Sequence, residues 1–370
     1  MKLSLHGRIG AIALTGALAL SLAACGSDDP TGSGDTTDAP AQTSELSGDL
    51  NGAGATSQEK AMDAWRAGFQ SANPDVNINY DPVGSGGGRT QFLDGSVDFA
   101  GSDSALTAEE LESAKAVCTT EAIDLPQYIS PIAVVFNLEG ITELNLSAAT
   151  IAGIFDNKIT TWDAPEIAAE NPDATLPATV ITPVHRSDES GTTKNFTDYL
   201  AKASGGAWTY EADGNWPFQT GESAQGTSGV IQAVQGADGT IAYADNSAVG
   251  TLGVASIKVG EEWVAPSEEG AAAAVDASPR DDERAEHDIV IKIDRETTQA
   301  GAYPLILISY GVACLQYDTA EKADLVKGFL SYVVSAEGQS AAEEAAGSAP
   351  LSDALRTDVQ AAIDAITAAA

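Results

Sequence analysis

The sequence predicts an α/β fold, and two observations indicate it. First, a strand-like run, a glycine-rich turn and a helix-like run follow one another repeatedly, near residues 46–70, 76–94 and 179–202. Units of this kind build a sheet covered by helices, with ligands at the carboxyl ends of the strands. Second, the chain has 370 residues and is 43% hydrophobic, which exceeds what one core usually supports. We therefore expect two globular domains.

The first unit begins with a strand expected at 46–50, followed by the turn 51–57. A helix follows, because Met62, Trp65 and Phe69 lie at helical spacing. The same kind of pattern predicts a strand at 76–80, a turn at 84–89, a short helix at 90–94, a strand at 96–103 and a helix at 107–117.

The central unit places a polar segment between a strand at 179–184 and a helix at 194–202. A helix start offers free N–H groups and a positive dipole end, and Gly191 lets an ion approach the backbone. The guanidinium of Arg186 and the hydroxyls of Ser190 and Thr192 would complete an oxyanion site. An ordinary helix cap beside a surface arginine is the alternative for this segment taken alone.

Two earlier turns, at Thr56-Ser57 and at Ser85, also place hydroxyls at helix starts. Each is a weak signal alone, since glycine there can serve only a tight turn. Neither matches a P-loop or a dinucleotide-binding motif. The recurrence of three such turns favours a binding site. Towards the C-terminus we expect a surface excursion without chemistry at 261–286 and a packing helix at 351–368.

Composition excludes several classes of function. The chain has 54 acidic and 18 basic residues and a formal net charge of −36. This charge argues against nucleic acid and against docking on anionic lipid, so an anionic ligand would have to be held by local geometry. The histidines are His6, His185 and His287, and no cluster has metal-ligand spacing, so we expect no metal and no cofactor.

The N-terminus predicts export. Basic residues precede an apolar run at 9–24, which is short for a membrane span and suited to a signal core. The run ends directly before Cys25 and resembles a bacterial lipobox, so residues 1–24 would be a lipoprotein signal peptide and Cys25 the lipidated residue. An ordinary signal peptide with an incidental cysteine is the alternative. Residues 25–45 have the composition of a disordered tether.

Two cysteines remain after Cys25, namely Cys118 and Cys314. Outside the reducing cytosol they could form one disulfide. Two buried thiols are the alternative, because the sequence does not show whether their Cα atoms lie close together.

Four motifs together closely resemble bacterial phosphate-binding proteins, the substrate-binding components of the high-affinity ABC phosphate importer. The motifs are 52–56, 84–88, 97–103 and 186–192. Further stretches at 150–162, 239–243, 301–305 and 336–339 match other landmarks of that family. The resemblance extends from about residue 46 into the C-terminal region.

The resemblance implies a two-lobed, periplasmic-binding-protein-like α/β fold of type II, with a hinge crossed twice and the ligand in the cleft between the lobes. Lobe one would comprise 46–129 plus 297–365, and lobe two 130–296. Both Cys118 and Cys314 would then lie in lobe one, which favours the disulfide.

The resemblance also implies a set of ligand contacts. Asp188 matches the carboxylate that pairs with the binding arginine, and Ser57 stands where some members carry phenylalanine. Contact at that position comes from the backbone N–H, so serine should preserve it. The implied phosphate contacts are Thr56, Ser57, Ser85, Asp103, Arg186, Ser190, Gly191 and Thr192.

The implied function is extracytoplasmic binding of inorganic phosphate and its delivery to the permease of an ABC importer, by a monomer anchored to the cell membrane through lipid. Phosphate retains a hydroxyl near neutral pH and sulfate does not, so an ionised Asp103, which can only accept, would select phosphate. A helix-capping role is the alternative for Asp103.

We do not expect an enzyme, because a secreted phosphatase would need a second active-site histidine beside His185, and Ser190 lacks the nucleophile-elbow pattern. Two further classes stay open at this point. One is a sulfate- or molybdate-binding protein, and the second is an adhesion or sensory lipoprotein.

Overall fold

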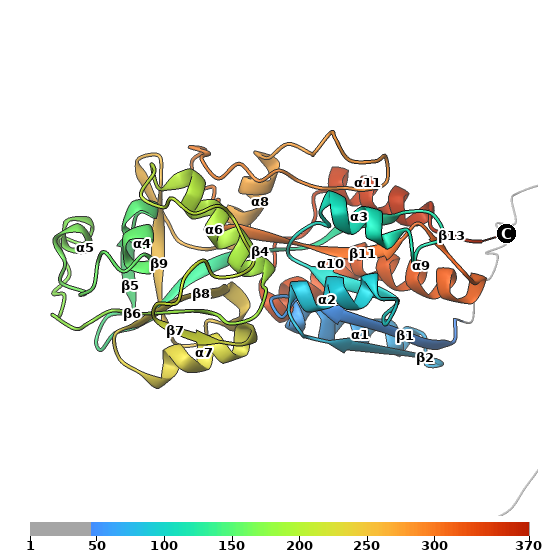
Figure 1. Cartoon of the computed structure of the whole chain (residues 1–370), viewed down its shortest axis with the longest axis horizontal. Helices are drawn as coiled ribbons and strands as arrows, with labels where there is room; N and C mark the ends of the chain where they lie inside the picture. Colours follow the sequence, from blue (N-terminus) through green and yellow to red (C-terminus); the bar gives the residue numbers. More distant parts are fainter. Residues whose placement is uncertain (1–45, 370) are drawn as a thin grey trace, which may run out of the picture. The chain divides into compact units, whose positions relative to one another are not determined.

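The computed structural model describes residues 46–369 (Figure 1). The predicted signal peptide 1–24, the predicted lipidated Cys25 and the predicted tether 25–45 lie outside the described residues. Among the residues that are described, no helix is long and apolar enough to span a membrane.

Strands and helices alternate along the first half of the described chain. The strands are β1 (Gly48–Gly54), β2 (Val76–Asp81), β3 (Phe99–Ser102), β4 (Ala122–Asn137), β5 (Glu143–Leu146), β6 (Thr182–Arg186), β7 (Glu222–Ala224), β8 (Thr240–Asp245), β9 (Gly253–Val259), β10 (Glu262–Val264), β11 (Ile306–Cys314), β12 (Gln316–Tyr317) and β13 (Thr367–Ala368). The helices are α1 (Glu59–Ala72), α2 (Ser85–Leu93), α3 (Ala108–Ala114), α4 (Ala148–Phe155), α5 (Pro165–Glu170), α6 (Gly191–Ala203), α7 (Gly226–Gly236), a 3-10 turn η1 (Asn246–Ala248), α8 (Glu268–Asp276), α9 (Ala320–Val334), α10 (Ala336–Ala346) and α11 (Asp353–Asp364).

One mixed sheet organises these elements, in the order β2-β1-β3-β11-β4-β8-β6-β7, and β9 pairs with β4, β5 and β10. The long strand β4 joins its two ends, because residues 122–131 pair with β11 and residues 132–137 pair with β8. Every residue of β4 up to Phe136 is buried, including the polar residues Asp124, Gln127 and Ser130. In Figure 1, β4 and β11 run between a group of elements on the right, which includes β1, β2, α1, α2, α9 and α11, and a group on the left, which includes β5 to β9.

Strand direction decides which turns meet. At one end of the sheet, β1 is parallel to β3, which is antiparallel to β11, and β11 is antiparallel to β4, so β1 and β3 run in the same direction as β4. At the other end, β8 is antiparallel to β4 and parallel to β6, so β6 runs in the opposite direction. The carboxyl ends of β1 and β3 therefore point towards the β6 end of the sheet, and the carboxyl end of β6 points back towards β3.

Most predicted elements are present, with shifted boundaries. In α1 the apolar stripe Met62, Trp65 and Phe69 is buried, as its spacing predicts. The prediction of a turn at 84–89 was wrong after Gly84, because Ser85 opens α2 and the glycines lie inside that helix. Their packing is the reason: a Cβ at Gly88 would lie 2.4 Å from the Cα of Gly54 in β1.

The expected surface excursion at 261–286 was also wrong in part. Residues Glu262–Val264 form β10, and Glu268–Asp276 form α8 behind the N-cap Ser267. Helix α8 buries Gly270, Ala271 and Ala274, so its small residues serve close packing rather than a solvated loop. The composition alone did not distinguish the two, since alanine suits both a buried helix and a surface segment.

A disulfide joins Cys118 and Cys314, with their Cα atoms 5.2 Å apart. The bond links the segment after α3 to the end of β11 across 196 residues of sequence. Of the two alternatives for these cysteines, the disulfide is therefore the one that the structure contains.

Reduction of this disulfide is expected to destabilise the chain by about 3–5 kcal/mol, because the bond closes a long loop in the unfolded chain. Thermal denaturation with and without reductant measures the effect. The Cys118→Ala/Cys314→Ala variant, which should melt like the reduced protein, is the control for incomplete reduction. Mass measurement after alkylation checks the bond directly, and two free thiols in the unreduced protein would contradict it.

Candidate functional site

Asp103 brings Ser57 and Ser85, from the first segment of the chain, together with Thr192 at the start of α6. It follows β3 and is 3% exposed. Its Oδ1 accepts a hydrogen bond from Ser57 Oγ at 2.6 Å, and its Oδ2 accepts one from Thr192 Oγ1 at 2.9 Å. Its backbone N–H donates to Ser85 Oγ at 3.1 Å. Three predicted residues, from the loop after β1 and from the starts of α2 and α6, thus bond to Asp103, two of them at its carboxylate and Ser85 at its backbone N–H.

The start of α6 packs directly against Asp103. Ser190 is the N-cap and accepts a hydrogen bond from the backbone N–H of Thr193 at 3.2 Å. A side chain at Gly191 would clash, since its Cβ would lie 2.6 Å from Asp103 Cβ and 2.6 Å from Ser85 Oγ. Glycine is required here so that the positive end of α6 can approach Asp103 and Ser85 this closely.

Arg186 ends β6 and is buried. Its Nε donates to Asp188 Oδ1 at 2.8 Å, and its Nη2 pairs with Asp188 Oδ2. The backbone N–H of Gly226 also donates to Asp188, at 3.1 Å. Burial would raise the pKa of Asp188, but its bonds to Arg186 and to Gly226 outweigh burial and lower the pKa, so this carboxylate stays ionised. Asp188 therefore orients the guanidinium beside Gly84, where a Cβ would lie 3.4 Å from Nη2.

Thr56 connects to a helix start that the sequence analysis missed. Its Oγ1 lies 3.0 Å from Thr227 Oγ1 and accepts a hydrogen bond from the backbone N–H of Thr227 at 3.1 Å. Thr227 lies in the first turn of α7, which follows β7. Its sequence signal, a glycine and two hydroxyl residues between a strand and a helix, was of the same kind as the three turns that were recognised.

Asn195 is a second residue that the sequence analysis missed. Its Nδ2 donates to the backbone oxygen of Asp103 at 2.7 Å and to that of Gly191 at 2.9 Å. This amide fixes the Asp103 loop to α6. Its helical position gave no signal, because a buried asparagine inside a helix looks like any polar surface residue in sequence.

Burial sets the electrostatics of Asp103. It raises the pKa of the carboxyl group above its ordinary value, although hydrogen bonds from Ser57 and Thr192 and the charge of Arg186 oppose the shift. When ionised, Asp103 can only accept hydrogen bonds, whereas the groups around it are mostly donors.

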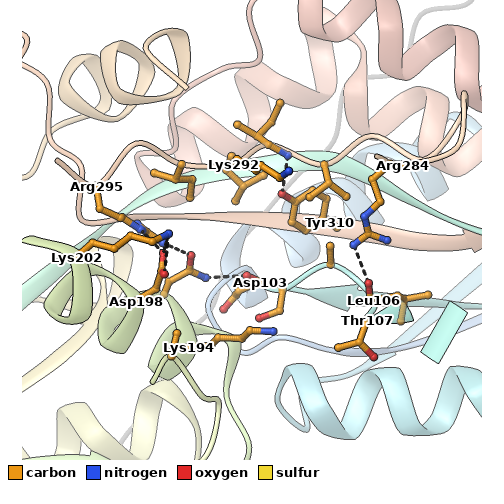
Figure 2. Close-up of a pocket in the computed structure, with 18 residues that line it drawn as sticks. Asp103, Leu106, Thr107, Lys194, Asp198, Lys202, Arg284, Lys292, Arg295 and Tyr310 are labelled. Carbon is orange, nitrogen blue, oxygen red and sulfur yellow. Dashed lines mark hydrogen bonds and ion pairs between the residues drawn. The ribbon is translucent and has the colours of Figure 1, made fainter. Parts of the chain in front are cut away.

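A cavity of about 340 Å³ lies beside this cluster (Figure 2). Among the predicted phosphate contacts, Asp103 alone borders it. Five of the chain's 18 basic residues line the cavity, and carboxylates neutralise most of them: Lys202 and Arg295 pair with Asp198, Arg284 pairs with Asp288, and Lys292 pairs with Asp281. Of these pairs, the one between Arg295 and Asp198 links the 284–295 segment to α6.

No metal centre is present in the part of the chain that the structure describes, and His185 has a packing role there. No group of three or more metal-ligating side chains occurs within 46–369. His185 is buried and stacks on Trp216 with ring centroids 4.9 Å apart, and its Nδ1 lies 2.8 Å from the backbone oxygen of Arg186. Packing accounts for this histidine.

Comparison with known proteins supplies the family. A model of the PBP superfamily domain matches residues 36–337. The chain is 35% identical over 375 residues to phosphate-binding protein PstS 3 of Mycobacterium tuberculosis, covering 99% of this chain and 100% of that protein. The chain belongs to the phosphate-binding protein PstS family. A second relative, phosphate-binding protein PstS 2 of the same species, is 34% identical over 379 residues and is also covered completely.

Solved structures agree on the fold. The PstS-family chain superposes on the phosphate-bound periplasmic phosphate-binding protein PfluDING with a TM-score of 0.69 at 24% identity, covering 85% of this chain and 93% of that one. For the ancestral soluble variant of the human phosphate binding protein the TM-score is 0.70 at 23% identity, with the same coverage. The predicted α/β periplasmic-binding-protein fold is thereby confirmed. The full-length relatives confirm the resemblance to phosphate-binding proteins. Members of the PstS family are binding proteins, so the expectation of a protein that is not an enzyme is also confirmed.

Replacing Asp103 by asparagine is expected to raise the melting temperature by about 1–3 °C at pH 7–8. Because the pKa of Asp103 is raised from 3.8, the folded chain holds this proton more tightly than the unfolded chain does. The contribution of Asp103 to stability is therefore greatest below pH 3.8 and falls as the pH rises towards the raised pKa. Asparagine does not ionise, so the variant does not lose this stability as the pH rises.

Thermal scans of Asp103→Asn and of the unaltered protein between about pH 3.5 and pH 8 test this expectation. The gain should shrink to nothing at the acid end. Asp163→Asn, at an exposed aspartate, should leave the melting temperature unchanged across the range. An Asp103→Asn protein that is less stable than the unaltered protein at pH 8 would contradict the argument.

Proposed function

We propose that this PstS-family chain binds inorganic phosphate outside the cytoplasm and delivers it to the membrane permease of an ABC phosphate importer. The observation that carries the proposal is the meeting of Ser57, Ser85 and Thr192 at Asp103, with Arg186 close by. The names of its full-length relatives as phosphate-binding proteins support the same ligand.

In this proposal one group of side chains donates to the anion and one accepts from it. The donors are the guanidinium of Arg186, the side-chain hydroxyls of the proposed contacts and the backbone N–H groups at the start of α6. All of these groups are suited to bind an oxyanion. The single acceptor, Asp103, would accept a hydrogen bond from the hydroxyl that phosphate retains. Sulfate would instead face an unpaired buried carboxylate, which costs several kcal/mol. The proposed contacts are Thr56, Ser57, Ser85, Asp103, Arg186, Ser190, Gly191 and Thr192, with Asp188 holding Arg186.

The hydroxyls that now bond to Asp103 or to Thr227 are proposed to turn towards the anion. Ser57 and Thr192 both donate to Asp103, and Thr56 bonds to Thr227. Hydroxyl groups rotate freely and can donate to phosphate without a change of rotamer elsewhere. The backbone positions of these residues already surround Asp103, so binding would need rearranged hydrogen bonds rather than a new fold.

We further propose that the two ends of the sheet are two lobes that close on phosphate, with boundaries at 46–129 plus 297–365 for lobe one and 130–296 for lobe two. The change of partner along β4, from β11 to β8, supports a hinge near residue 131. A second crossing would lie in the 295–306 segment that leads into β11. Hinge closure around a ligand is a common mechanism for binding proteins of this kind.

The remaining parts of the proposal concern localisation and partners. We propose that Cys25 carries lipid after removal of residues 1–24, that 25–45 tethers the folded part to the outer face of the membrane, and that a single chain meets the permease. The comparison with PstS 3 supports this assignment, because the similarity covers 99% of the chain and so includes most of the N-terminal segment.

Calorimetric titration of ligand-free protein tests the ligand and its selection. Phosphate should bind tightly, arsenate should compete because it also keeps a proton, and sulfate should bind weaker by orders of magnitude. Asp103→Asn should weaken phosphate binding by about tenfold or more and should narrow the difference from sulfate. Unchanged selectivity in the variant would contradict the role of Asp103. Equal binding of sulfate and phosphate by the unaltered protein would contradict the proposed ligand.

Arg186→Lys should weaken phosphate binding by about 10–100-fold, because an ammonium group cannot reproduce a two-pronged guanidinium contact. Arg356→Lys, on the exposed face of α11, is the matched control and should leave the affinity unchanged. Unaltered affinity in Arg186→Lys would show that Arg186 only braces Asp188.

A further inference from the structure

Arg89 and Glu189 form an ion pair across the two ends of the sheet. Arg89 lies in α2, which begins at Ser85, and Glu189 directly precedes Ser190 at the start of α6. The Nη2 of Arg89 lies 3.1 Å from Glu189 Oε1, although 100 residues separate them in sequence. Each partner therefore sits in the same short segment as a proposed phosphate contact, one from each side.

Arg89 is fixed on its own side. Its Nε donates to Glu110 Oε1 at 2.8 Å, and its Nη1 donates to Ser102 Oγ at 3.1 Å. Glu110 is held in turn by a capping box with Thr107 at the start of α3. Burial would lower the pKa of Arg89, but the charges of Glu189 and Glu110 outweigh burial and raise the pKa, so the guanidinium stays charged. The remaining nitrogen of its guanidinium, Nη2, donates to Glu189.

Glu189 fits into a space that only glycines leave open. A Cβ at Gly86 would lie 1.9 Å from Glu189 Oε2, and a Cβ at Gly214 would lie 2.2 Å from Oε1. Oε2 is buried and has no hydrogen-bond partner among the described residues. Burying a carboxylate oxygen that has no hydrogen-bond partner costs free energy. The ion pair with Arg89 offsets part of this cost. Opening of the site would remove the cost, because water could then reach the oxygen.

We propose that the ion pair of Arg89 and Glu189 is a latch that holds the site closed and so sets the rate at which phosphate leaves; this role rests on the proposed function. When the two ends of the sheet separate, Arg89 keeps Glu110 and Ser102, and Glu189 gains water on both oxygens. The latch therefore contributes only in the closed state. Its buried, unpartnered oxygen limits its strength, which keeps release possible.

Stopped-flow measurement of phosphate binding and release by the full chain tests the latch. Glu189→Gln keeps the shape and removes the charge. It should raise koff about tenfold while kon stays within about twofold, because loss of one charge from a partly buried, hydrogen-bonded pair acts mainly on dissociation. Glu170→Gln is the matched control. Glu170 is also partly buried and accepts from Ser147 N and Thr150 Oγ1 near α4, so its loss should leave koff unchanged.

A double-mutant cycle separates the latch from a general loss of stability. Arg89→Gln and the Arg89→Gln/Glu189→Gln pair should both show the raised koff of Glu189→Gln, because either change alone already removes the cross-link. In the unaltered protein, koff should rise with salt concentration more steeply than in Glu189→Gln, a readout that does not depend on the Arg89 variants folding well.

The outcomes distinguish the latch from the proposed function. An unaltered protein that does not bind phosphate would overturn both. Phosphate binding with the same koff in Glu189→Gln and in the unaltered protein would overturn the latch alone. Additive effects of the two substitutions, or an equal rise of koff in Glu170→Gln, would likewise show that Arg89 and Glu189 act on stability separately and not as a latch.

Discussion

The pairing of β4 is the constraint on which the rest of the structure depends. Its residues 122–131 pair with β11 and its residues 132–137 with β8, so a single buried strand belongs to both ends of the sheet. Because β1 and β3 run with β4 while β6 runs against it, the carboxyl ends of the strands from the two ends face one another. The glycine- and hydroxyl-rich turns at those ends have to meet.

The meeting point is built from close backbone approach and one buried carboxylate. Because Gly191 has no side chain, Asp103 and Ser85 can lie close to the start of α6. At the start of α7, Gly226 donates to Asp188 and lies against Thr56. Burial raises the pKa of Asp103, and hydroxyls from both sides satisfy its oxygens. In the proposed function, the ionised carboxylate would accept a hydrogen bond from the phosphate hydroxyl, so the same burial that weakens the ligand-free fold would contribute to selectivity.

Local charges, rather than the net charge of −36, decide what the site can hold. Arg186 is matched by Asp188, Arg89 by two glutamates, and the cations of the adjacent cavity by aspartates, so most buried positive charge is already balanced. In the proposed function, an anion at the site would therefore be held by oriented N–H and O–H groups and the guanidinium of Arg186. Such an arrangement would let a strongly acidic chain bind an anion.

The sequence by itself determined the local units and, through the resemblance of its motifs, the fold class and the predicted contacts from Thr56 to Thr192. These follow from short-range patterns of apolar spacing, glycine and hydroxyl residues. Only the tertiary structure decided that Gly86 and Gly88 lie inside α2, that 268–276 is a buried helix, and that Thr227, Asn195 and the pair of Arg89 and Glu189 join the site. Those features depend on contacts between segments distant in sequence. A helical asparagine or arginine has the same local pattern whether it faces water or a partner 100 residues away.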